Sequence, residues 1–289
     1  MTQLSRSKRT LHANGVDICV EAVGDATDPP ILLIMGSSAT MDWWPDEFCE
    51  LLAGGGRCVI RYDHRDTGES VSYEPGSPGY TGADLTADAV GLLDALALER
   101  AHLVGMSMGG GIAQEVALDH PDRVMSLTLI STGPAVASRE PRNLPGMSAE
   151  ASARFAALPT PDWSDRAAVM DYIVELERAC AGSLPFDEER FHAYAERVVA
   201  RTTNVQSALT NHDVMDHGSG PKGSLSEIAA PTLVVHGAED PLFPHPHGVA
   251  LAEEIPDATL LTLERGGHEL HREHWDRVAA AILEHTRSG

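Results

Sequence analysis

Two patterns of apolar and polar residues alternate along the chain. Short apolar runs such as Pro30–Met35 and Cys58–Tyr62 are typical of strands buried on both faces of a parallel sheet. Other segments, such as Asp84–Leu96, repeat apolar residues at helical spacing. The expected strands are Thr10–Ala13, Val16–Val23, Pro30–Met35, Cys58–Tyr62, Leu103–Val104, Val124–Ile130, Thr232–Val235 and Thr259–Leu263. The alternation predicts an α/β fold: a mostly parallel, eight-stranded sheet flanked by helices and joined by right-handed crossovers.

The pattern changes between residues 134 and 223. Strand-like runs disappear there, and the segment is too long for a loop in a compact domain. The expected helices in it are Ser148–Leu158, a helix capped by Ser164, Asp187–Thr202 and Val205–Asp216. Elsewhere we expect helices at Trp43–Leu52, Ile112–Asp119 and His274–His285. The sequence thus predicts a core of residues 1–133 and 224–289, with residues 134–223 inserted as a helical cap.

Composition narrows the class of partner. The chain has 289 residues, with 43 acidic and 21 basic ones and a net charge of −22, which would repel nucleic acid and anionic membrane surfaces. Four scattered cysteines lie in predicted strands or helices, as expected for reduced thiols. The polar N-terminus lacks the apolar part of a signal peptide, and no apolar run could span a bilayer. We expect a cytoplasmic protein without nucleic-acid or membrane partners, either a monomer or a homodimer.

A glycine-flanked serine follows one of the predicted strands. Leu103-Val104 leads into Gly105-x-Ser107-x-Gly109, and a helical segment follows. This strand–turn–helix context is typical of a nucleophile elbow, in which a strained turn exposes the serine hydroxyl. Flanking glycines allow strand and helix to approach closely. We predict that Ser107 is a catalytic nucleophile.

A serine nucleophile needs a base, and the base needs an acid that orients it. Asp240 follows the strand Thr232–Val235, and His268 follows the last predicted strand after two glycines. The carboxyl ends of parallel strands lie at one edge of the sheet, so Ser107, Asp240 and His268 are expected to converge there. Glu239 is the alternative acid.

The oxyanion of a tetrahedral intermediate needs two preorganised N–H donors. We predict that they are the backbone N–H groups of Met108, directly after the nucleophile, and of Ser37, in the loop after Pro30–Met35. The candidate residues of the substrate pocket are Gly36, Trp43, Trp44, Phe155, Trp163 and Phe186. For the two adjacent tryptophans, packing in the core is an equal alternative.

Other polar clusters favour structural roles over metal binding. His245-Pro246-His247 and His268-x-x-His271-x-x-His274 look like ligand sets, but Arg272 stands where a His-Glu-x-x-His motif needs its second histidine. Asp63-His64-Arg65-Asp66 is interpreted as a charge cluster that fastens a loop. We therefore expect no metal and no cofactor.

These residues resemble the α/β-hydrolase superfamily across nearly the whole chain, and more closely its aclacinomycin methylesterase group, which removes a methyl ester from an anthracycline polyketide. The segments that carry the closer resemblance are Met35-Gly36, Trp44–Phe48, Val59–Gly68, Ala87–Val90, Asp240-Pro241 and His285–Ser288. The resemblance implies the α/β-hydrolase fold, a Ser-His-Asp triad and a bulky methyl ester as substrate. Residues 134–223, where substrate choice would be made, show no clear match.

The function expected from the sequence is hydrolysis of a small-molecule carboxylic ester through an acyl-enzyme. A cofactor-free perhydrolase of the haloperoxidase type, a C–C bond hydrolase and a lactonase would use the same triad and remain alternatives. A ligand-binding protein without activity is the alternative outside enzymes. An epoxide hydrolase or dehalogenase would need an aspartate where Ser107 stands.

Overall fold

An eight-stranded sheet runs through the described part of the chain, which in this computed structural model comprises residues 4–136, 143–218, 220 and 223–287. The strands are β1 (Arg6–Ala13), β2 (Val16–Val23), β3 (Pro30–Ile34), β4 (Cys58–Tyr62), β5 (Ala101–Met106), β6 (Val124–Ile130), β7 (Thr232–Gly237) and β8 (Thr259–Leu263). Their spatial order is β1-β2-β4-β3-β5-β6-β7-β8. Pairing is antiparallel for β1 with β2 and for β2 with β4, and parallel from β4 onward. The predicted mostly parallel sheet is confirmed.

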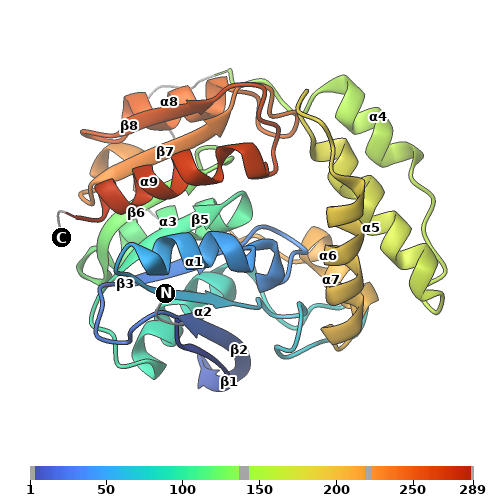
Figure 1. Cartoon of the computed structure of the whole chain (residues 1–289), viewed down its shortest axis with the longest axis horizontal. Coiled ribbons are helices and arrows are strands. Elements are labelled where there is room, and N and C mark those ends of the chain that lie inside the picture. Colours follow the sequence, from blue (N-terminus) through green and yellow to red (C-terminus); the bar gives the residue numbers. More distant parts are fainter. Residues whose placement is uncertain (1–3, 137–142, 219, 221–222, 288–289) are drawn as a thin grey trace.

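Side chains of the central strands alternate between two apolar cores on opposite faces of the sheet. In β3, Ile31 and Leu33 belong to one core, and Leu32 and Ile34 to the other. The first core is completed by α1 (Asp46–Gly54) and α9 (Trp275–His285), the second by α2 (Gly82–Ala95), α3 (Met108–Asp119) and α8 (Pro246–Glu254), as Figure 1 shows. Burial on both faces is the reason that these strands read as unbroken apolar runs.

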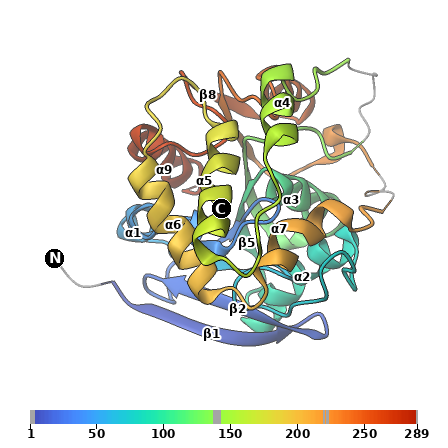
Figure 2. The same cartoon turned by 90° about the vertical axis from the view of Figure 1, so that its right-hand side faces the viewer.

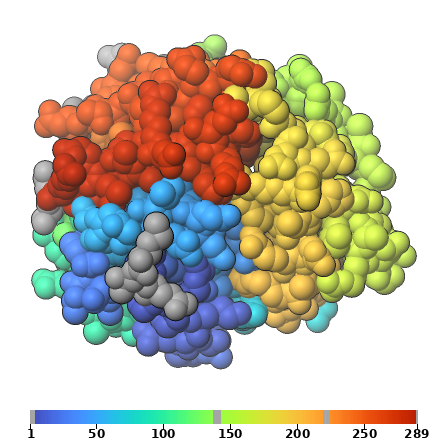
Figure 3. Space-filling model, viewed as in Figure 1, coloured from blue at the N-terminus to red at the C-terminus, as the bar shows by residue number. Residues whose placement is uncertain are grey.

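Four helices lie between β6 and β7 and gather at one end of the sheet (Figures 1 and 2). They are α4 (Ala149–Ala157), α5 (Arg166–Cys180), α6 (Glu188–Arg201) and α7 (Val205–Val214). Residues of α5 and α6 form a small apolar cluster of their own, against which Trp43 packs. Figure 3 shows the yellow part of this segment lying against the red C-terminal segment and the blue region of the chain. Helices thus occupy the segment predicted as a cap, while its status as a separate domain with bounds at 134 and 223 stays a prediction.

Local chemistry shifts some helix ends from their predicted places. The expected helix Trp43–Leu52 is divided, because Pro45 is the N-cap of α1 and a short 3-10 turn, Met41–Trp43, precedes it. The cap of α5 is Asp165 rather than Ser164, since the Asp165 side chain accepts from the first backbone N–H groups of the helix. Helix α8 was not predicted.

The state of the cysteines and the character of the helices can be compared with the expectation of reduced thiols and no membrane span. The four cysteines are free and buried. Within the described residues, no helix has both the length and the apolar character needed to cross a membrane.

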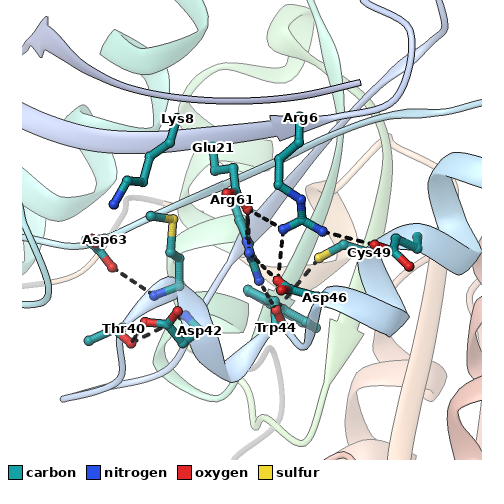
Figure 4. Close-up of polar contacts among 12 residues, drawn as sticks. Arg6, Lys8, Glu21, Thr40, Asp42, Trp44, Asp46, Cys49, Arg61 and Asp63 are labelled. Atoms are coloured by element: carbon teal, nitrogen blue, oxygen red, sulfur yellow. Dashed lines mark hydrogen bonds and ion pairs between the residues drawn. The ribbon is translucent and has the colours of Figure 1, made fainter. Parts of the chain in front are cut away.

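A buried arginine connects the sheet to the start of α1 (Figure 4). Nε of Arg61, on β4, donates to Oε2 of Glu21 on β2 at 2.9 Å, and an Nη donates to Oδ1 of Asp46 at 2.5 Å. The carbonyl oxygen of Trp44 accepts a further hydrogen bond from Arg61. Arg6 joins from the edge strand, 2.9 Å from both Glu21 and Asp46. These contacts fix the chain that leads from β3 into α1, and with it the loop beside Ser37.

Replacing Arg61 with alanine is expected to lower the free energy of unfolding by about 3–5 kcal/mol, because it leaves the carboxylate of Glu21 buried beside fewer positive partners. Urea unfolding followed by circular dichroism measures the change. The matched control is Arg154→Ala, which breaks the exposed pair with Glu150 and is expected to cost less than about 1 kcal/mol. Equal costs for the two variants would contradict the role given to Arg61.

Candidate active site

Ser107 lies at a sharp turn between β5 and α3. Its backbone has φ +54° and ψ −121°, a strained conformation for a residue with a side chain. A Cβ added to Gly105 would lie 2.2 Å from the carbonyl oxygen of Gly109, and one added to Gly109 would lie 2.1 Å from that of Ile34. The glycines are therefore required for the start of α3 to pack against β5 and β3. This is the geometry of a nucleophile elbow.

Asp240 and His268 meet at the same edge of the sheet. Nδ1 of His268 lies 3.0 Å from Oδ2 of Asp240, and the backbone N–H groups of Leu242 and Phe243 donate to Oδ1 of Asp240, each at 2.9 Å. The backbone N–H of His268 donates to the carbonyl of Cys180 at the end of α5, at 2.8 Å. With Nδ1 donating to the carboxylate, Nε2 is the ring atom left to act as a base.

The alternative acid is placed elsewhere. Glu239 is exposed, and its carboxylate accepts from the backbone N–H of Ser183 at 2.7 Å, whereas His268 contacts Asp240. His236 is buried behind Asp240, and its Nε2 contacts the carbonyl oxygen of Phe243 at 2.7 Å. Its ring therefore supports the loop that carries Asp240.

The predicted oxyanion loop lies directly against Ser107. A Cβ added to Gly36 would lie 3.2 Å from Cβ of Ser107 and 3.7 Å from its Oγ. Neither the Ser37 N–H nor the Met108 N–H donates to another residue within the described chain. Met108 is also the first residue of α3, where backbone donors have no partner within the helix. Both groups are free to donate to a ligand, as an oxyanion hole requires.

A cavity of about 1250 Å³ opens above Ser107 and His268, which both line it. Its walls come from the loop after β3, from α4, α5, α6 and α7 of the inserted segment, and from the segments that follow β7 and β8. Of the predicted pocket residues, four line it: Gly36, Trp43, Phe155 and Phe186. The space exceeds the roughly 300–1000 Å³ of ordinary ligand pockets, so it accommodates a bulky molecule.

Two predicted pocket residues do not line this cavity. Trp44 has no exposed surface and stacks on Phe48 in the core beneath α1, with ring centroids 6.1 Å apart. Adjacent residues point in different directions here, so Trp43 faces the cavity and Trp44 the core. Trp44 therefore follows the core alternative, whereas Trp163 packs edge-to-face on Tyr172 at 6.0 Å and does not line the cavity as expected.

The Asp63–Asp66 cluster fastens the loop after β4 to its surroundings. Asp63 accepts three hydrogen bonds from Arg201 of α6, the shortest at 2.7 Å. Arg65 makes a bidentate pair with Asp88, at 2.7 Å for both contacts. Burial raises the pKa of Asp63 to about 6, although Arg201 acts in the opposite direction. The structural interpretation of this cluster is confirmed.

Three of the candidate metal ligands contact other protein groups through Nε2. Nε2 of His245 contacts Thr262 at 3.0 Å, Nε2 of His247 the carbonyl of Pro145 at 2.8 Å, and Nε2 of His271 the carbonyl of Pro185 at 3.2 Å. In the described ranges, no group of three or more histidine, cysteine or acidic side chains is arranged to hold a metal ion.

Comparison with known proteins identifies the family to which the chain belongs. The Hydrolase_4 family model, described as "Serine aminopeptidase, S33", matches residues 28–274. The chain is an α/β-hydrolase of this family. It is 34% identical to rhodomycin D methylesterase DauP of Streptomyces sp. (strain C5), over 97% of this chain and 98% of that one, and 32% identical to DnrP of Streptomyces peucetius over the same shares. A solved esterase (EaEST) from Exiguobacterium antarcticum has the same fold, with a TM-score of 0.76 and 22% identity over 98% of this chain and all of that one.

Two carboxyl groups that the sequence did not single out lie in the cavity of this hydrolase. They are Glu177 of α5 and Glu269, which directly follows His268. Burial raises the pKa of Glu177 to about 7 and that of Glu269 to about 8, and the charge of Glu177 contributes to the second shift. Arg190, also at the cavity wall, donates instead to the hydroxyl of Tyr194 at 2.7 Å. The position next to His268 was the one available sequence signal for Glu269; Glu177 offered none.

These pKa shifts predict that Glu269 makes the protein less stable as the pH rises. A carboxyl with a raised pKa in the folded state stays protonated there while the unfolded chain ionises above about pH 4.3, so its contribution falls between about pH 4.3 and 8. Glu269→Gln keeps the shape and removes the titration. The Tm of the variant minus that of the wild type should therefore be more positive at pH 8.5 than at pH 5, measured by calorimetry.

Glu239→Gln is the control, because that exposed carboxylate has a lowered pKa through its contact with Ser183 and should not reproduce the trend. A Tm difference for Glu269→Gln that is constant between the two pH values would show that the carboxyl ionises normally.

Proposed function

We propose that this α/β-hydrolase cleaves carboxylic esters through an acyl-enzyme on Ser107, and that its substrate is the methyl ester of a bulky, polyketide-like acid. The observation that carries the proposal is the 3.0 Å contact between His268 and Asp240 beside a large cavity that Ser107 also lines. The names of DauP and DnrP, both rhodomycin D methylesterases, support the substrate class.

Each step uses a group whose surroundings suit it. Nε2 of His268 takes the proton of Ser107 as Oγ attacks the ester carbonyl, and Asp240 stabilises the imidazolium. The N–H groups of Ser37 and Met108 donate to the oxyanion. His268 then returns the proton to the leaving methoxide, so that methanol departs, and a water molecule releases the acid from Ser107 by the same steps.

The cavity supports a large acid and a small alcohol. Methanol needs little room, so most of the roughly 1250 Å³ is available to the acyl part of the substrate. Aromatic rings at the wall, including Trp43, Phe191 and Tyr194, offer flat apolar surfaces to a polycyclic acid. The reduced, buried cysteines fit a cytoplasmic enzyme, and we infer that location for it.

The first test compares p-nitrophenyl esters, from acetate to decanoate, with methyl esters of polycyclic acids, using wild type and Ser107→Ala. We expect hydrolysis in the wild type, with higher kcat/KM on the bulky methyl esters. In Ser107→Ala, turnover should fall by a factor of about 10⁴ or more, because the nucleophile is lost while binding persists.

Full activity in Ser107→Ala would refute the serine mechanism. If the wild type reacts covalently with a phosphonate but hydrolyses none of these esters, the ester substrate is wrong. Peracid formation from acetate and peroxide, cleavage of a vinylogous diketone, or opening of a lactone then distinguishes the remaining reactions of the same triad.

A further inference from the structure

The loop that carries the Ser37 N–H is held on both sides by buried histidines. Nε2 of His64, in the loop after β4, donates to the carbonyl oxygen of Met35 at 2.9 Å. Nδ1 of His212, on α7 of the inserted segment, accepts from the backbone N–H of Ser38 at 2.8 Å. The two imidazole rings meet edge to face, 6.0 Å apart.

These two contacts restrain the peptide that matters for catalysis. Peptide groups are planar, so the Met35 carbonyl and the Ser38 N–H fix the planes before and after the Gly36–Ser37 peptide. That middle peptide carries the Ser37 N–H. Ser38 itself has φ +60°, a conformation that a residue with a side chain keeps only when its surroundings impose it.

The partners of His212 determine its protonation. Nδ1 faces an N–H donor and must accept, while Nε2 lies 3.0 Å from the carbonyl oxygen of Arg65 and must carry the proton. Burial lowers the pKa of His212 to about 3, with the nearby His64 adding to the shift. The ring is therefore neutral near pH 7, and its Nδ1 accepts the hydrogen bond from the Ser38 N–H.

Helix α7 is itself anchored on the core. Oγ of Ser207 donates to the carbonyl of Tyr73 at 2.6 Å, and Nδ2 of Asn211 donates to Asp66 at 2.9 Å. Oδ1 of Asn211 accepts from the N–H of Gly76 at 2.7 Å. His212 is thus held by a helix that does not rest on the oxyanion loop alone.

We propose that His212 is a positioning residue: from the inserted segment, it holds the Ser37 N–H in the orientation in which it donates to the oxyanion. The inserted segment, whose helices wall the cavity, then also completes the catalytic geometry, although His212 and Ser38 are 174 residues apart in the sequence. The inference rests on the proposed function, since it concerns the oxyanion hole of that reaction.

Two replacements separate the two hydrogen bonds of the ring. In His212→Asn, the side-chain oxygen takes the place of Nδ1 and accepts from Ser38; in His212→Gln, the side-chain NH₂ takes the place of Nε2 and donates to Arg65. We expect His212→Gln to lower kcat about 10-fold or more while KM stays within about 3-fold. A misplaced Ser37 N–H weakens the stabilisation of the oxyanion in the transition state more than it weakens substrate binding. His212→Asn should keep a kcat at least several-fold above that of His212→Gln.

The matched control is Ser207→Ala on the same helix, which removes a buried hydrogen bond to the core without touching the oxyanion loop. It should lower the Tm and leave kcat unchanged. Labelling of Ser107 by a phosphonate gives a second readout, because its tetrahedral product also places an oxygen in the oxyanion hole. The rate constant for labelling should follow the order of kcat.

Equal losses of kcat in His212→Asn and His212→Gln, or the same loss in Ser207→Ala, would overturn the inference and leave the esterase proposal standing. Persistence of turnover in Ser107→Ala would instead defeat the esterase proposal and the inference with it. Should His212→Gln fail to fold, His212→Leu replaces it, with the same fall in kcat expected because the contact to Ser38 is lost.

Discussion

The close packing of α3 against the end of β3 is the constraint on which the site depends. The backbone of Gly109 lies so near the carbonyl of Ile34 that no side chain fits between them. This contact brings Ser107 against Gly36, and so places its hydroxyl beside the loop that carries the Ser37 N–H. The strained backbone of Ser107 is the cost of that placement, and packing on both sides of the elbow maintains it.

Around this fixed point, the inserted helices are joined to the core largely by buried polar contacts. Arg201 of α6 contacts Asp63 at 2.7 Å and Asp42 at 2.6 Å, while Asn211 and His212 of α7 bind the loops after β4 and β3. Polar contacts are directional, and a buried group left without its partner is expensive. They therefore define one arrangement of the insertion over the sheet more sharply than apolar packing would.

The cavity combines apolar walls with two carboxyl groups near His268. The aromatic rings of α6 and Trp43 form one wall. These are Glu177 and Glu269, which both hold their protons to higher pH than ordinary carboxyls because burial disfavours their charge. The environment of the imidazole is therefore set by the insertion as well as by the sheet, since Glu177 and Cys180 both belong to α5.

The sequence by itself determined the features that depend on local patterns. Apolar runs identified the buried strands of the sheet, and the glycines around Ser107 identified the turn at which it lies. Because Asp240 and His268 each follow a predicted parallel strand, the sequence also placed them at one edge of the sheet, where the structure brings them together. These predictions succeed because a buried parallel strand and a tight turn each impose their requirements on consecutive residues.

Only the tertiary structure decided the contacts between distant segments. It turned Trp43 toward the cavity and Trp44 into the core, and packed Trp163 on Tyr172. It also placed Glu177 near His268, and His212 against Ser38. Such pairings depend on how the inserted helices pack over the sheet. The spacing of apolar residues predicts that one face of a helix is buried, but not which residues lie opposite that face. The sequence alone could therefore not reveal these contacts.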